Sequence, residues 1–83
     1  MAGKQNIVGS QVRKHRYQQG LTQEMLAGRC ATIGWDISRG TLSKIEAQVR
    51  CVSDQELLLL AKALKVSPTE LYPAHQTSKA KTR

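Results

Sequence analysis

The sequence predicts an all-α fold, a compact bundle of five short helices. Its 83 residues suit one domain, and a hydrophobic content of 40% suffices for a small core. Apolar residues recur at intervals of three and four, the period of an amphipathic helix, and no stretch reads as a strand. The six Gly and two Pro are too few for a chain built on many turns. A large enzyme, a transporter and a multidomain scaffold are excluded, and no apolar run is long enough for a membrane span.

The first two helices are predicted from the residues at their ends. Residues 7–19 should be helical after a loose tail at 1–6, and Gly20 should end this helix in the left-handed conformation. Thr22 is a good N-cap for a second helix, because its hydroxyl can accept from the free backbone N–H groups of the first turn. Gly34 should end the second helix.

The last three helices also begin at capping residues. Ser38 caps a third helix over 39–47. Ser53 opens a fourth with a capping box, and the leucines of this helix should make it the most buried. The sequence Ser-Pro-Thr-Glu at 67–70 opens a short fifth helix, which Pro73 ends.

Positive charge is strong and unevenly placed. The formal net charge is +7. The first 20 residues carry four cations and no acid, whereas acids outnumber cations over 53–72. The folded domain should span 7–73, followed by a disordered basic tail at 74–83. This distribution favours a protein with one face toward a polyanion such as nucleic acid.

The two cysteines, Cys30 and Cys51, show no pairing or metal-site spacing. Without an apolar leader the chain should stay in the cytoplasm, where both thiols are reduced. We expect no metal and no cofactor, since no histidine completes a zinc pattern. No catalytic triad, carboxylate pair or phosphate loop is present, and five short helices offer little room for a small-molecule pocket. The chain is therefore not expected to be an enzyme.

Three sequence blocks, in order, resemble one family. They are R-x-x-x-G-L-T-Q-E-x-L-A at 16–27, I-S-R-G-T-L-S-K-I-E at 37–46 and E-L-L-L-L-A-K-A-L-K-V-S-P-T-E-L at 56–71. Together they resemble the phage-repressor, Cro-type or xenobiotic-response-element family of helix-turn-helix DNA-binding domains. The resemblance implies a lambda-repressor-like fold whose second and third helices form the helix-turn-helix. It also implies a small prokaryotic or phage regulator of repressor or controller type that binds double-stranded DNA.

The third helix has the two faces that reading a major groove requires. On a helical wheel one arc is small, polar or basic, and the opposite arc is mostly apolar. Arg39 can donate two hydrogen bonds to guanine, and Lys44 can reach guanine or a phosphate. The alternative for both charges is an ordinary solvated face. The candidate base-reading residues are Arg39, Gly40, Thr41, Ser43 and Lys44.

Other residues would position the domain on the DNA backbone. Gln23 lies at the positive end of the second helix, and the resemblance implies that it contacts a phosphate and braces Arg39. The resemblance also pairs Arg16 with Glu46 and leaves Arg16 near a phosphate. The alternative is two unlinked surface charges. The candidate phosphate-contacting and positioning residues are Gln23, Thr22, Arg16, Arg13, Lys14, Gln48 and Arg50.

The chain departs from the family pattern at three places, one of which is His15, where an apolar residue is usual. Residues 31–35 lengthen the turn before the third helix, either as extra helix or as a bulged loop. Gln48 stands where the family has glycine. A left-handed glutamine costs on the order of 1 kcal/mol, unless the turn is built differently.

A single reading helix covers few base pairs, so we expect a homodimer on a two-fold operator. The candidate dimer residues are Trp35, Leu58, Leu59, Leu71 and Tyr72. Trp35 is otherwise a lid over the core. The alternative function is a protein-interaction module or antitoxin-like partner-binding protein on the same fold. Gly40 and Ala47 on the reading face favour that alternative, as does the lengthened turn.

Overall fold

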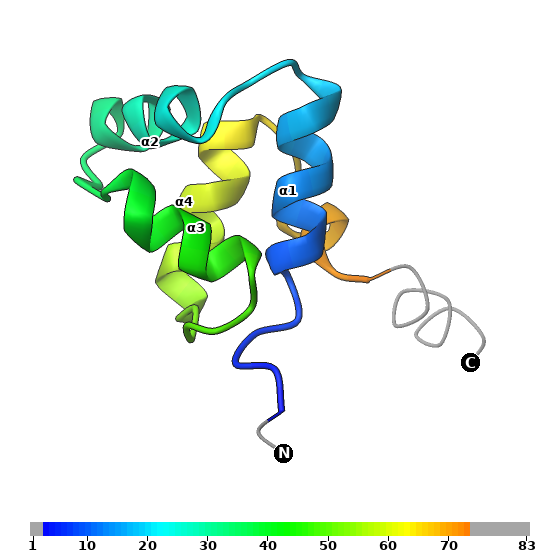
Figure 1. Ribbon diagram of the computed structural model, residues 1–83. Coiled ribbons are helices and arrows are strands. Elements are labelled where there is room, and N and C mark those ends of the chain that lie inside the picture. The colour runs from blue at the N-terminus through cyan, green and yellow to red at the C-terminus, as the bar shows by residue number, and fades with distance from the viewer. Residues whose placement is uncertain (1–2, 74–83) are drawn as a thin grey trace.

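Four α-helices and a 3-10 turn make up residues 3–73, the part of the chain that the computed structural model describes (Figure 1). This part of the chain contains no strand, which confirms the all-α prediction. The elements are α1 (Gly9–Gln18), α2 (Gln23–Thr32), α3 (Arg39–Glu46), α4 (Asp54–Leu64) and the 3-10 turn η1 (Pro68–Leu71).

The predicted fifth α-helix is wrong, because η1 is a single 3-10 turn. The predicted cap is present, with Glu70 reaching back to the backbone of Ser67 at 3.1 Å. Only four residues then follow before Tyr72, which is extended at ψ 148°. A residue that precedes proline disfavours the helical conformation, so Pro73 stops the helix before it completes a second turn.

The other helices begin where their caps predict. The side chains of Thr22, Ser38 and Ser53 each accept a backbone N–H three residues further on. Ser53 and Glu56 complete the capping box. Gly20 has a φ of +70°, the left-handed conformation expected after α1.

The start of α1 differs from the prediction. The helix begins at Gly9 rather than at residue 7, because the side chain of Asn6 accepts the backbone N–H groups of Val8 and Gly9, at 3.1 and 2.7 Å. Asn6 was placed in the loose tail at 1–6, and it is buried. The predicted tail at 74–83 lies outside the described residues.

The lengthened connection before α3 is shared between helix and loop. The second helix continues to Thr32, and the chain then turns through Gly34, whose φ is +94°. Ile37 is buried, and Trp35 packs half-buried against the core. These two side chains anchor the connection, as the lid role of Trp35 predicted.

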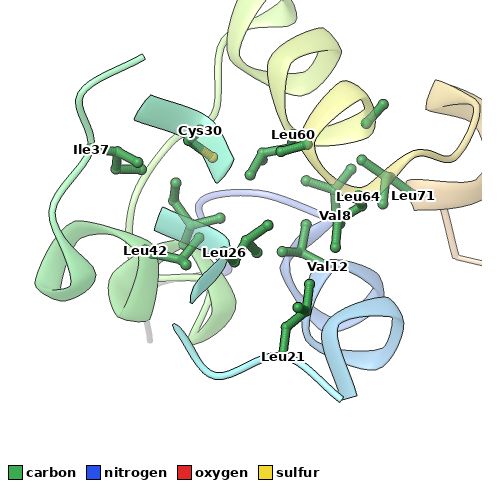
Figure 2. Packing of buried hydrophobic residues seen from close by; sticks show 13 residues of the cluster. Val8, Val12, Leu21, Leu26, Cys30, Ile37, Leu42, Leu60, Leu64 and Leu71 are labelled. Carbon is green, nitrogen blue, oxygen red and sulfur yellow. The ribbon is translucent and has the colours of Figure 1, made fainter. Parts of the chain in front are cut away.

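The core lies between all four helices and includes η1 (Figure 2). The third helix packs against α1 and α2. The fourth helix also packs against α1 and α2, and it lies behind α3 in the view of Figure 1. Leu71 is 0% exposed and belongs to this core, so its prediction as a dimer contact is wrong. The fully buried side chains are Leu26, Leu42, Ile45, Leu60, Leu64, Leu71, Val12 and Cys30.

Candidate nucleic-acid interface

The third helix presents the split surface that its sequence predicts. Leu42 and Ile45 are fully buried on its inner side. The side chains on its outer side are exposed, and they are Arg39, Ser43, Lys44 and the small residues Gly40 and Ala47. A helix with this division can lie close to another surface without losing its own packing.

The side chains of Arg39 and Lys44 have no hydrogen-bond or ion-pair partner within residues 3–73. Their donors are therefore available to an external acceptor. Thr41 differs, because it is half-buried and its hydroxyl accepts from Ser38 at 3.0 Å. Of the predicted base-reading residues, Thr41 thus lies apart from the exposed set.

A buried ion pair joins α1 to α3, which confirms the predicted pairing. Nε of Arg16 donates to Glu46 Oε2 at 2.7 Å, and Nη2 donates to Oε1 at 2.9 Å. Nη1 of the same arginine donates to the carbonyl of Leu21 at 2.8 Å. Arg16 and Glu46 are only 6% and 8% exposed, and the hydrogen bond that Arg16 donates to Glu46 raises the pKa of Arg16. Arg16 therefore holds α3 in place and presents little surface to a phosphate.

Gln23 joins this network from α2. Its Nε2 donates to Glu46 Oε1 at 3.1 Å. Gln23 therefore braces Glu46, whereas the resemblance predicted that it braces Arg39. The Glu46 carboxylate thus accepts hydrogen bonds from both Gln23 and Arg16. Thr22, Gln23 and Arg39 nevertheless line one hollow beside the start of α2.

A second anchor holds the C-terminal end of α3, and sequence reasoning missed it. Nδ2 of Asn6 donates to the carbonyls of Ile45 and Arg50, at 3.1 and 2.8 Å. Gln48 has the predicted left-handed backbone, with a φ of 64°, and its side chain donates to the Asn6 carbonyl at 3.1 Å. The only local signal for this anchor is an asparagine three residues before the first helical residue. The contacts of Asn6 with residues far away in the sequence leave no local pattern.

The remaining positively charged candidates for phosphate contacts lie in two different parts of the structure. Arg13 and Lys14 are exposed on α1 and line a hollow with Ala47 and Gln48 beside the end of α3. Arg50 instead pairs with Glu56 at 3.0 Å. The hydrogen bond from Arg50 is the main reason that the pKa of Glu56 lies below its usual range.

No group of His, Cys, Asp and Glu that could hold a metal ion occurs within 3–73. Cys30 and Cys51 are both free thiols. Cys30 is buried, and this burial raises the pKa of its thiol, so it acts as a core residue. No helix in the described part is long and apolar enough to cross a membrane.

The dimer candidates other than Leu71 reach the surface to different extents. Leu58 is 57% exposed and Tyr72 is 38% exposed. Trp35 and Leu59 are half-buried.

Comparison with known proteins identifies the family. The family description for helix-turn-helix proteins matches residues 11–71, so this chain belongs to the helix-turn-helix family, of the xenobiotic-response-element type. Family and fold are those of DNA-binding transcription regulators, which are not enzymes. No curated protein is significantly similar to the chain in sequence.

Solved structures show the same fold. The restriction-modification controller protein C.AhdI from Aeromonas hydrophila is 34% identical, with a TM-score of 0.69 over 78% of this chain and 91% of that one. The controller protein C.Esp1396I is 28% identical, with a TM-score of 0.68 over 86% and 85%. The DNA-binding domain of BldD is 27% identical, with a TM-score of 0.71 over 88% and 100%.

Proposed function

We propose that this chain is a small transcription regulator that binds specific double-stranded DNA by placing α3 in the major groove. One observation carries the proposal. The outer side of α3 exposes the side chains of Arg39, Ser43 and Lys44, which have no partner in residues 3–73, while its inner side is held by the core and by the pairing of Glu46 with Arg16. The similarity to C.AhdI, a restriction-modification controller protein, supports a regulator of repressor or controller type.

Each surface residue has a role in this proposal. Arg39 donates to a guanine edge, and Lys44 reaches a base or a phosphate. Gly40, Ser43 and Ala47 allow the helix to approach the groove closely. Thr41 contributes at most from the margin, because it is half-buried.

Backbone contacts would come from the elements beside α3. Thr22 and Gln23 lie at the N-terminus of α2, where free N–H groups favour a phosphate. Arg13 and Lys14 lie on α1, near the end of α3 and Gln48. These contacts supply affinity without sequence preference.

We further propose that two copies bind a two-fold operator. An α3 of eight residues covers few base pairs, so a second reading helix is needed for high specificity. The exposed side chains of Leu58 and Tyr72, with Leu59 and Trp35 beside the core, remain the candidates for the contact between copies.

The test is a salt titration of DNA binding. A preferred duplex is first selected from a random-sequence library, and a scrambled duplex of equal composition serves as the control. Fluorescence anisotropy should give a preference of about a thousandfold or more, with affinity falling steeply as salt rises. Equal binding to both duplexes would contradict specific reading, and binding to neither would contradict a DNA-binding role.

A further inference from the structure

Tyr17 is a large exposed side chain beside the proposed DNA-reading surface. It lies in the last turn of α1 and is 60% exposed. It lines one hollow with Gln23 and Arg39, and a second with Ser43 and Ala47. Tyr17 therefore lies beside α3 at both hollows, and it is not part of the hydrophobic core.

Two arginines hold the Tyr17 ring. The guanidinium carbon of Arg16 lies 4.6 Å from the ring centroid, and that of Arg13 lies 5.3 Å from it. The Arg16 guanidinium is itself fixed by Glu46 and by the Leu21 carbonyl. The ring thus rests on a group that the buried network keeps in place, and its hydroxyl has a defined position.

The hydroxyl of Tyr17 can donate a hydrogen bond outward. Arg13 Nη2 donates to Tyr17 Oη at 3.5 Å, a long contact that leaves the phenolic hydrogen free. No acceptor for this hydrogen occurs in the described part of the chain. The pKa of Tyr17 is lowered, chiefly by the hydrogen bond from Arg13 and then by that from Arg16. A more acidic phenol is a stronger donor.

We propose that Tyr17 and Arg13 together bind one phosphodiester of the DNA backbone beside α3. The Tyr17 hydroxyl donates to a phosphate oxygen, and Arg13 supplies the positive charge. A phosphate fits because it offers only acceptors and a negative charge, whereas the ring is already occupied by two guanidinium groups. The inference rests on the proposed DNA-binding function and adds to it a phosphate contact that fixes how α1 lies against the duplex.

Tyr17→Phe tests the hydroxyl, because it keeps the ring and its contacts with both arginines. We expect affinity to fall about tenfold on the selected and the scrambled duplex alike, with base preference and unfolding unchanged. Thr69→Val is the control, since it also removes an exposed hydroxyl but lies on η1, outside the residues proposed to contact DNA or a second copy, and it should bind as the wild type does. Arg13→Ala should reduce the slope of log affinity against log salt concentration by about one, the value for one lost phosphate contact. Tyr17→Phe should leave this slope unchanged.

A scan with neutral methylphosphonates locates the contact. At one position of the selected duplex, neutralising the phosphate should weaken the wild type but should not weaken Tyr17→Phe further. If Tyr17→Phe binds as the wild type does, or if no position shows this coupling, the phosphate contact is wrong while specific DNA binding stands. If the wild type binds neither duplex, both proposals are overturned.

Discussion

The two faces of α3 differ in how much of their bonding capacity the protein itself uses. On the inner face Leu42 and Ile45 are fully buried, and Glu46 receives hydrogen bonds from Arg16 and Gln23. On the outer face the side chains of Arg39 and Lys44 have no hydrogen-bond or ion-pair partner within residues 3–73. The inner face therefore sets where the helix lies, and the outer face is left for a ligand. Substitutions should separate the two, with stability lost from one face and DNA binding from the other.

The largest expected effect is on the inner face. Glu46→Ala leaves the Arg16 guanidinium buried without its counter-charge, and we expect the free energy of unfolding to fall by about 3 kcal/mol. Glu24→Ala is the matched control, because this glutamate is exposed in the first turn of α2 and should cost less than about 1 kcal/mol. Denaturant unfolding measures both. Equal losses would show that the buried pair does not hold α3.

The next effect concerns the contact between α1 and the end of α3. A Cβ added at Gly9 would collide with the Ile45 carbonyl, so Gly9→Ala should destabilise the fold by about 1–3 kcal/mol. Gly28→Ala lies in the middle of α2, where an added Cβ meets nothing within 4 Å. This variant should instead gain up to about 1 kcal/mol from helix propensity. Thermal unfolding should therefore show opposite signs, and a gain for both would refute the close packing.

A smaller effect separates two left-handed residues. Lys65, which has a φ of 59°, is exposed, so Lys65→Gly should relieve strain and add about 1 kcal/mol of stability. Gln48→Gly relieves the same strain but loses the hydrogen bond to the Asn6 carbonyl, so its gain should be smaller. Equal gains in denaturant unfolding would mean that the Gln48 side chain does not help to anchor α3.

The smallest effect involves the outlying pair of Arg50 and Glu56, whose side chains are 34% and 22% exposed. Arg50 holds the pKa of Glu56 below its usual range. A lowered folded-state pKa adds stability above the usual glutamate pKa of about 4.3, and that stability is lost as the pH falls through the folded-state value. Solvent screening keeps the contribution under about 1 kcal/mol.

Glu56→Gln tests this pH dependence, since the amide can keep the capping contact without the charge. The wild type should be slightly more stable at neutral pH, and the difference should shrink as the pH falls below the usual glutamate pKa of about 4.3. A difference that stays constant between pH 7 and pH 3 would rule out the charge as its source.

Local sequence signals predicted most of the fold. The caps at Thr22, Ser38 and Ser53 and the glycine turn at Gly20 act within a few residues, so they are visible in the sequence. The 3-10 character of η1 was missed, because Pro73 shortens a helix that Ser67 begins correctly. Leu71 was wrongly predicted as a dimer contact. The sequence near the C-terminal end of the fold does not distinguish an apolar residue that packs into the core from one that faces a second copy.

The candidate site was only partly predictable. The resemblance supplied the Arg16–Glu46 pair, since the motif residues at both positions are present. Asn6 was missed because its partners Ile45 and Arg50 lie 39 and 44 residues away, and no local pattern marks such contacts. The position of Tyr17 beside α3 likewise depends on how α1 packs, which the sequence does not show.

The most direct test of groove reading compares Arg39→Ala with Lys14→Ala on the selected and scrambled duplexes. Arg39→Ala should weaken binding to the selected duplex by about 1–3 kcal/mol and hardly affect binding to the scrambled one. The ratio of the two affinities should therefore fall, while the free energy of unfolding stays unchanged. Lys14→Ala should weaken both alike and lower the salt dependence by about one contact. If both variants lose the same affinity on both duplexes, α3 does not read the sequence through Arg39.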